Sequence, residues 1–224
     1  MTIMSSPYTN PPIITFRHCD PINHILCFNE VLQVCPICRI RLDNGRAEFP
    51  LPPVRLPSLF MNAVTKPHCL AIKPTYGSFL QTYMPGHFLH AGISNSKGVV
   101  YNYDDNGIHQ DTSSWEQCVV IPLLGCHDYE MKQEWDTELH QFSMSSGWTR
   151  ERYHEGINNC FDFVVGFLNH IDYNQTVKHI SKPITREELC QDYIVSMTTK
   201  AAQYISIHHA IRKDGYIIQR DLPS

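Results

Sequence analysis

One cysteine stands where a helix is expected to begin, in the stretch YHEGINNCFDFVVGFLNHI at residues 153–171. Asn158 and Asn159 are good N-cap residues, and apolar residues recur at helical spacing after Cys160, so we expect a mostly buried helix that starts there. The sulfur would then lie at the positive end of the helix dipole, among free backbone amides that favour a thiolate and stabilise an oxyanion. Cys160 is therefore interpreted as a nucleophile, with a small buried residue at a helix start as the alternative.

A base for this thiol stands upstream, in FLHAGISNSKGVVYNYD at residues 88–104, which alternates like a β-hairpin. If the loop is 95–97, His90 lies directly opposite Asn102. If the loop is 96–98, with Gly98 in the left-handed conformation, His90 faces Asp104, and Asn102 becomes its diagonal neighbour on the same face. Either register brings an amide to the imidazole. Cysteine, histidine and asparagine are the residues of papain-type nucleophilic catalysis.

HAGISNSKGVVYN and NNCFDFV resemble the hairpin and the nucleophile block of the permuted papain-like families, which include lecithin retinol acyltransferase-like and bacterial NlpC-type proteins. The resemblance implies that Cys160 attacks, that His90 is the base and that Asn102, twelve positions after His90, orients the imidazole. The chain departs from the acyltransferase branch at Asn102, where that branch has a second histidine, and at Phe161 and Asp162, where it has Glu-His. Asp162 is expected to raise the pKa of the thiol, because it adds a nearby negative charge.

A second resemblance covers most of the chain. HAGISNSKGVVYNY, SSWEQCVVIPLL, NNCFDF and the cysteine-bearing FRHCDPINHILCF together resemble the makorin-2 opposite-strand protein family. This resemblance implies relatives and no particular reaction, so the function has to be argued from the site.

The N-terminal part of the chain has the spacing of a metal-binding module. The CPIC sequence places two thiols two residues apart, which lets both meet one tetrahedral zinc at a turn. We expect a structural zinc, with buried free cysteines as the alternative and a redox pair as the third choice. The predicted ligands are Cys19, Cys27, Cys35 and Cys38, with His18 or His24 as substitutes for a cysteine.

Composition limits the classes of protein to which the chain can belong. The 224 residues are 42% hydrophobic and 18% charged, with a formal net charge of −4, so a sizeable core is expected and nucleic-acid binding is not. We find no apolar stretch of membrane-spanning length and no hydrophobic signal core near the start. The chain is therefore predicted to be intracellular and cytoplasmic, where nine cysteines indicate thiols and metal binding rather than disulfides.

The predicted architecture is α+β. We expect a disordered start at 1–12, a zinc-ribbon-like module at 13–48, a proline-rich linker at 49–65 and a permuted papain-like domain at 66–224, with an antiparallel sheet packed on the Cys160 helix. A buried strand is predicted at 119–124 and an amphipathic helix at 130–142. After a capping box at Thr185 and Glu188, a long helix with a bend is expected to run to Gly215, before a final strand at 216–220.

The function predicted from these residues is that of a thiol hydrolase or acyltransferase. Cys160, His90 and Asn102 would act on an amide, isopeptide, thioester or lipid ester, so the expected partner is a protein or lipid substrate. The alternative is a catalytically inactive papain-like scaffold that serves as a protein-interaction module.

Overall fold

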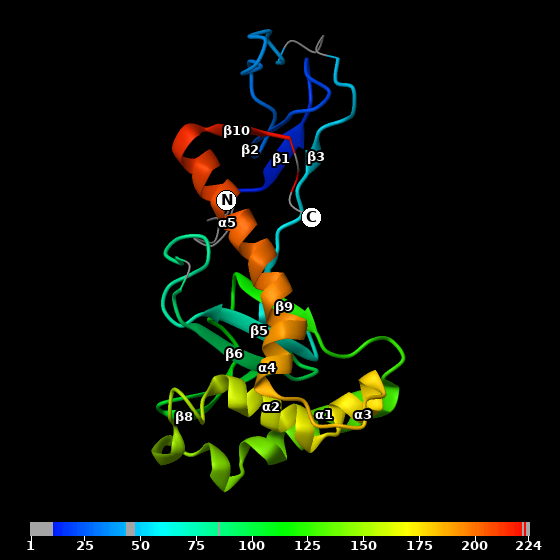
Figure 1. The fold of residues 1–224 in the computed structure, drawn as a ribbon, viewed down its shortest axis with the longest axis vertical. Coiled ribbons are helices and arrows are strands. Elements are labelled where there is room, and N and C mark those ends of the chain that lie inside the picture. The colour runs from blue at the N-terminus through cyan, green and yellow to red at the C-terminus, as the bar shows by residue number, and fades with distance from the viewer. Residues whose placement is uncertain (1–10, 44–47, 85, 221, 223–224) are drawn as a thin grey trace, which may run out of the picture. The chain divides into compact units, whose positions relative to one another are not determined.

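The protein is described by a computed structural model that covers residues 11–43, 48–84, 86–220 and 222 (Figure 1). Contacts divide the chain into two units. One contains residues 1–59 together with 200–224, and the other contains residues 60–199. The predicted disordered start at 1–12 lies almost entirely outside the described residues.

The unit formed by the two ends of the chain is built on a four-stranded antiparallel sheet in the order β10-β2-β1-β3. Strand β10 is the final strand predicted from the sequence, and it pairs with β2 rather than extending the sheet of the other unit. Strand β3 comes from the proline-rich segment, which therefore contributes to a sheet as well as connecting elements. The strands are β1 (Ile13–Phe16), β2 (His24–Phe28), β3 (Val54–Arg55) and β10 (Tyr216–Gln219).

The second unit is built on a six-stranded antiparallel sheet in the order β4-β9-β5-β6-β7-β8. The predicted hairpin forms β6 and β7, and the predicted buried strand forms β9. A short 3₁₀ turn, Ala63–Thr65, follows β4. The strands are β4 (Phe60–Met61), β5 (Cys69–Pro74), β6 (Leu89–Ser94), β7 (Val100–Asp104), β8 (Gly107–Asp111) and β9 (Cys118–Pro122).

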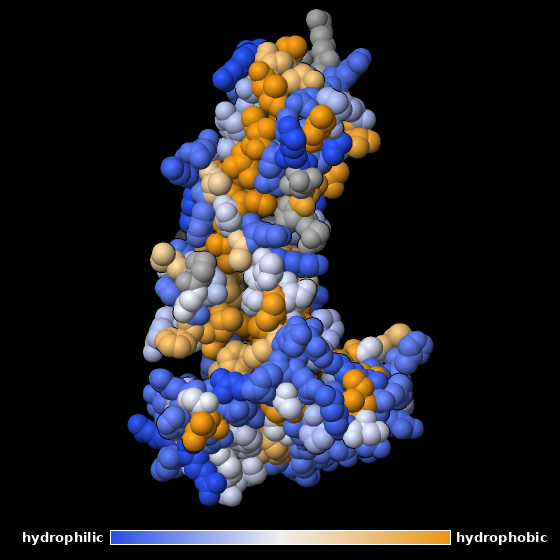
Figure 2. Space-filling model, viewed as in Figure 1, coloured by the Kyte–Doolittle hydropathy of each residue, from blue (hydrophilic) through white to orange (hydrophobic). Residues whose placement is uncertain are grey.

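Helices cover this sheet, and α2 (Cys160–His170) packs against β6 and β7 (Figure 1). Helix α1 (Tyr129–Ser143) is amphipathic: it buries Trp135 and Leu139, whereas hydrophilic side chains predominate over the helical part of this unit on the face shown in Figure 2. The indole of Trp135 donates a hydrogen bond to the backbone carbonyl of Ser94 at the end of β6 and packs edge-on against Phe167 of α2. Two 3₁₀ turns, Ser146–Trp148 and Arg150–Arg152, connect α1 to α2, which α3 (Tyr173–Lys178) follows.

The C-terminal helix has the predicted cap and stop. The side chains of Thr185 and Glu188 form a capping box at the start of α4 (Arg186–Leu189). A π-helical segment, Cys190–Val195, then interrupts the regular hydrogen bonding before α5 (Ser196–Asp214). Gly215 follows with φ +81°, the left-handed conformation in which glycine ends a helix at little steric cost.

The structure thus has mixed α and β elements with antiparallel sheets, as predicted. Among the described residues, no helix is both long and apolar enough to cross a membrane.

Candidate functional site

The hairpin of β6 and β7 adopts the second of the two expected registers. Gly92 pairs with Asn102 and Ile93 with Tyr101, and Gly98 lies in the turn with φ +80°. Asn102 is therefore the diagonal neighbour of His90, and its side chain reaches the imidazole: His90 Nε2 lies 2.8 Å from Asn102 Oδ1. Asn102 is buried, with an exposed fraction of 3%.

Asn102 also bonds to the carboxylate of Asp111, which in turn accepts a hydrogen bond from the indole of Trp115. Asn102 Nδ2 donates to Asp111 Oδ2 at 2.9 Å, and Trp115 Nε1 donates to the same oxygen at 2.9 Å. Because a carboxylate can only accept, Asn102 must present its NH₂ to Asp111 and its oxygen to His90. His90 Nε2 then carries the hydrogen, and the lone pair of the neutral ring is on Nδ1.

A positive charge lies over the ring of the Trp115 indole. Lys73 pairs with His90 across β5 and β6, and Lys73 Nζ lies 4.2 Å from the centre of the Trp115 ring and 2.9 Å from the carbonyl of Ser114. Burial lowers the pKa of His90, the hydrogen bond to Asn102 opposes this shift, and the charge of Lys73 lowers the pKa further. His90 is therefore neutral at physiological pH, as a general base needs to be.

Cys160 begins α2, as the sequence predicts. Asn159 is the N-cap, and its side-chain oxygen accepts from the Phe161 amide at 2.9 Å. The predicted net stabilisation of the thiolate is not found, because burial raises the pKa of the Cys160 thiol to about 11. The amides of Ala91, Phe161 and Cys160 act in the opposite direction by donating toward the sulfur, and burial outweighs them.

The Cys160 sulfur faces β6 at Ala91, the residue that follows His90 in the chain. The amide of Ala91, next to His90 in the chain, hydrogen-bonds to Cys160. Within the described residues, no hydrogen bond joins the sulfur directly to His90. The resting site therefore holds a neutral thiol and a neutral imidazole, rather than a thiolate and imidazolium pair.

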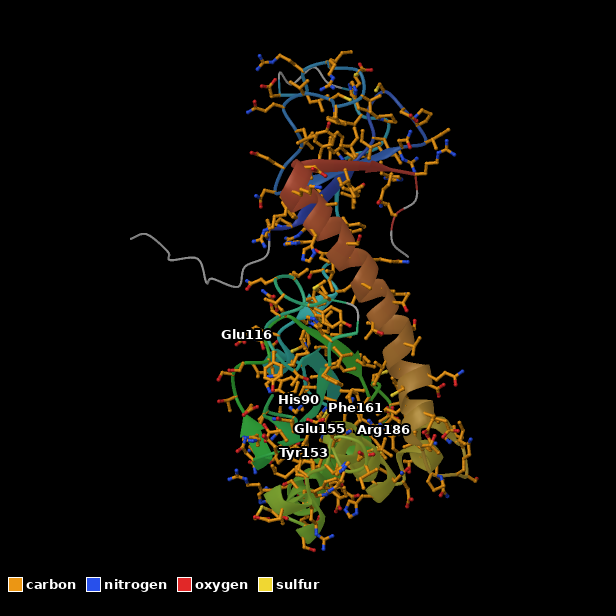
Figure 3. All side chains as sticks on the ribbon, turned by 60° about the vertical axis from the view of Figure 1, so that its left-hand side comes forward. His90, Glu116, Tyr153, Glu155, Phe161 and Arg186 are labelled. Atoms are coloured by element: carbon orange, nitrogen blue, oxygen red, sulfur yellow. The ribbon has the colours of Figure 1, made fainter. Side chains whose placement is uncertain are left out.

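The Asp162 carboxylate caps the start of α2 and forms an ion pair with Arg186. Its carboxylate accepts from the Asn159 amide at 2.9 Å, completing a capping box, and lies 3.5 Å from Arg186 Nη1. The same guanidinium lies 5.8 Å from the centre of the Phe161 ring and lowers the pKa of Cys160 through its charge. Figure 3 labels His90, Phe161 and Arg186 together with Tyr153 and Glu155 around this end of α2. The expected effect of Asp162 on the sulfur is therefore countered by a paired cation.

Two tryptophans lie near the site: Trp115 is part of the core, and Trp148 is partly buried. Trp115 is fully buried, and its ring lies 5.7 Å from that of His90, between centroids. Gly92 makes room for it, since a Cβ at Gly92 would lie 2.9 Å from Trp115 Cη2. Trp148 packs against Tyr103 and other aromatic side chains of this unit.

Four metal-ligating side chains of the N-terminal module come together. The ligand atoms of His18, Cys19, Cys35 and Cys38 all lie within 4.8 Å of one another. Cys19 Sγ is 3.8 Å from Cys35 Sγ, and Cys38 Sγ is 3.4 Å from His18 Nδ1. Ligands at about 2.3 Å (sulfur) and about 2.0 Å (nitrogen) from one tetrahedral zinc would show separations of about 3.8 and about 3.5 Å. The geometry of the cluster therefore fits a zinc ion.

Cys27 is the predicted ligand that lies outside this cluster, and His18, an alternative ligand, is present in it. Cys27 is buried in β2, where its thiol donates to the carbonyl of Glu30 at 3.0 Å, and burial raises its pKa to about 11. His24, the other alternative, uses its ring nitrogens on Thr15 and Arg17. Both residues of β2 thus have other partners and lie outside the cluster.

Three residues near the thiol site were missed from the sequence: Lys73, Asp111 and Arg186. Asp111 and Lys73 reach the site only through strand pairing, and β8 was not predicted at all. Arg186 follows the predicted capping box, but no periodicity indicates that it meets α2. One local feature could have drawn attention to Asp111: in DTSSWEQ, an aromatic residue, Trp115, is flanked by charged residues.

Comparison with known proteins gives a family and a relative. Residues 53–211 match the family described as DUF4796 C-terminal. The chain is also similar to the human protein named MKRN2 opposite strand protein, with 33% identity over 206 residues that cover 92% of this chain and 88% of the relative. No solved structure matches the chain. The resemblance to makorin-2 opposite-strand proteins is thereby confirmed, and neither name states a reaction.

Proposed function

The chain belongs to the DUF4796 C-terminal family, and we propose that it is a cysteine hydrolase or acyltransferase with Cys160, His90 and Asn102 as its catalytic residues. The observation that carries this proposal is the orientation of His90. Its Nε2 is bonded to an amide oxygen whose direction is determined by a carboxylate, which leaves the Nδ1 lone pair as the base.

In the proposed reaction, the Cys160 sulfur attacks a carbonyl carbon while His90 Nδ1 takes the thiol proton. The oxyanion that forms is received by backbone amides at the start of α2, which already donate toward the sulfur. His90 then gives the proton to the leaving group, and water or an acceptor alcohol, thiol or amine releases the acyl group from sulfur. Amides, isopeptides, thioesters and lipid esters all fit this sequence of steps.

The neutral state of both groups supports general-base activation. The pKa of Cys160 is raised and that of His90 is lowered, so proton transfer accompanies attack instead of preceding it. The chain order of His90, Asn102 and Cys160, and the packing of α2 on the hairpin sheet, support a permuted papain-like arrangement.

The test is the rate of iodoacetamide alkylation at Cys160 against pH, followed by mass spectrometry in the wild type and in His90→Ala. At pH 7 we expect His90→Ala to lower the rate roughly a hundredfold, because the base is lost. Above the thiol pKa the two proteins should react alike, since the thiolate needs no base. Exposed Cys126 and buried Cys118 serve as internal standards. Equal rates at pH 7 would reject catalysis by this pair and favour the inactive interaction scaffold.

We also propose that His18, Cys19, Cys35 and Cys38 hold one structural zinc. The separations of the ligand atoms support this, as does the Ile40 amide, which hydrogen-bonds to Cys38 and lowers the pKa of its thiol. Zinc would supply charge to hold deprotonated thiols together and would stabilise the module around them.

Elemental analysis tests this site with a matched pair of variants. Cys38→Ser should lose the single equivalent of zinc, whereas Cys27→Ser should retain it, because Cys27 lies outside the cluster. Metal-free wild-type protein that keeps its fold would reject the proposal.

A further inference from the structure

Asp111 lies two hydrogen bonds away from the imidazole. It is the last residue of β8 and pairs with Val100 in β7, so its side chain stands beside that of Asn102. One carboxylate oxygen, Oδ2, accepts from both Asn102 Nδ2 and Trp115 Nε1, each at 2.9 Å. Both hydrogen bonds to this oxygen come from donors that cannot accept one.

An asparagine amide has two ends of similar size and opposite polarity, so a neighbour has to decide which end faces the histidine. Asp111 can accept only, and it therefore requires the NH₂ end of Asn102. The carbonyl of Val100 also faces this NH₂ group, but at 3.5 Å it is too far for a strong hydrogen bond. Without Asp111, the Asn102 amide could rotate by about 180° and donate to His90 Nε2. The ring hydrogen would then be on Nδ1.

The carboxylate is itself held in place. The Trp115 indole is fully buried, it lies in the space left by the missing side chain of Gly92, and Lys73 covers its face. A buried N–H that already has Asp111 as its acceptor disfavours any other position of the carboxylate. The polarity of the hydrogen bonds is thus determined from Trp115 through Asp111 and Asn102 to His90.

We propose that Asp111 is a positioning residue that determines the His90 tautomer by dictating the orientation of the Asn102 amide. This inference rests on the proposed function for its consequence in catalysis, since only the Nε2–H tautomer leaves Nδ1 free to take the Cys160 proton. The tautomer itself can be measured whether or not the protein is an enzyme.

The experiment compares Asp111→Ala with two matched variants by two-bond ¹H–¹⁵N correlation spectra of the histidine rings at pH 8, with His90→Ala to assign the signal. Wild-type His90 should show a protonated Nε2 and a bare Nδ1. Asp111→Ala should give a mixture of both tautomers, because nothing then dictates the amide orientation. Asp111→Asn should restore the wild-type signal, because its amide oxygen can accept both hydrogen bonds.

The control is Asp104→Asn. Asp104 stands opposite His90 in the hairpin register and acts on its pKa through charge, but its carboxylate is bonded to His109 Nε2 at 2.8 Å. This variant should keep the Nε2–H tautomer. If Asp111→Ala does not fold, Asp111→Ser replaces it, because a hydroxyl can accept from Trp115 and yet either donate to Asn102 or accept from it.

A second measurement connects the tautomer to chemistry. Alkylation of Cys160 at pH 7 should fall roughly twofold in Asp111→Ala if the tautomers are evenly mixed, which is less than in His90→Ala, and should recover in Asp111→Asn. A folded Asp111→Ala protein with a pure Nε2–H tautomer would overturn the inference. Alkylation that is independent of His90 in the wild type would reject the proposed function instead, and the ring spectra would still decide the role of Asp111.

Discussion

The two units differ in the partners that their polar side chains have. In residues 60–199, the series from Trp115 through Asp111 and Asn102 to His90 is satisfied by its own hydrogen bonds, although other buried atoms of this unit, such as His68 Nε2 and Asn174 Oδ1, have no hydrogen-bond partner among the described residues. In the unit formed by the chain ends, three thiols and His18 converge, and the buried His208 has no hydrogen-bond partner for either ring nitrogen among the described residues.

This difference shows what each unit needs in order to be stable. A closed set of hydrogen bonds within a packed sheet needs nothing from outside, and its rigidity suits catalytic positioning. Converging thiols and an unpaired histidine make stability depend on conditions, the first on metal and the second on pH. The following changes test this contrast, beginning with the largest expected effect.

Removal of metal should affect one unit only. Structural zinc contributes about 10–16 kcal/mol of apparent binding free energy in zinc-finger peptides, comparable to the whole stability of a domain. In protein treated with a zinc chelator, we expect the amides of β1 and β2 to exchange with deuterium at least about a hundredfold faster, whereas β5 and β6 keep their protection. Added zinc should restore the exchange rates. Equal loss of protection in both units, or none in either, would contradict the contrast.

Acid should weaken the same unit through His208. Its ring is 2% exposed and packs against Phe28 at 4.9 Å between ring centroids. Burial, with the charges of Arg212 and His209, lowers its pKa from 6.5 to about 4. The unfolded chain therefore binds a proton at a higher pH than the folded chain does, so stability is complete above pH 6.5 and is lost as the pH falls toward 4.

The loss attributable to His208 is at most about 3 kcal/mol. Denaturant titrations between pH 7 and pH 4 measure it, with His208→Leu for comparison. The leucine variant should lose less stability over this interval than the wild type. An unchanged pH dependence in the variant would show that other groups account for the acid sensitivity.

Filling the space beside Trp115 should lower the unfolding free energy of the second unit by a smaller amount. A Cβ at Gly92 would lie 2.9 Å from Trp115 Cη2 and 3.0 Å from the carbonyl of Tyr101, which is backbone and cannot easily move. Gly92→Ala should therefore cost about 1–3 kcal/mol of unfolding free energy and slow the alkylation of Cys160, because the indole holds Asp111.

Gly147→Ala is the matched control for this change. Its added Cβ would meet only Ser145 Oγ at 3.7 Å, an ordinary contact, so stability and alkylation should match the wild type. If Gly92→Ala behaves like Gly147→Ala in both measurements, the site is less tightly packed than the structure indicates.

Local signals in the sequence were sufficient for the elements that carry the candidate residues. Asn159 and the apolar spacing after Cys160 predict α2 to its first residue, because caps and helical periodicity act over one or two turns. Thr185 with Glu188, and Gly215, likewise predict the limits of the C-terminal helix. The predicted pair of His90 and Asn102 is hydrogen-bonded because strand alternation brings these side chains to one face in either register.

Only the tertiary structure decided which groups surround those residues. Cys27 was the predicted ligand and His18 an alternative, and the fold brings His18 into the cluster while the Cys27 thiol bonds to the carbonyl of Glu30. The helix dipole predicts a lowered pKa for Cys160, but burial depends on the whole fold and raises it. Lys73 meets the site through the pairing of β5 with β6, and Asp111 through the pairing of β7 with β8, a strand that the sequence did not predict. Sequence determined the local geometry of the nucleophile and the base, whereas packing determined their protonation, because desolvation and hydrogen-bond polarity are set by non-local neighbours.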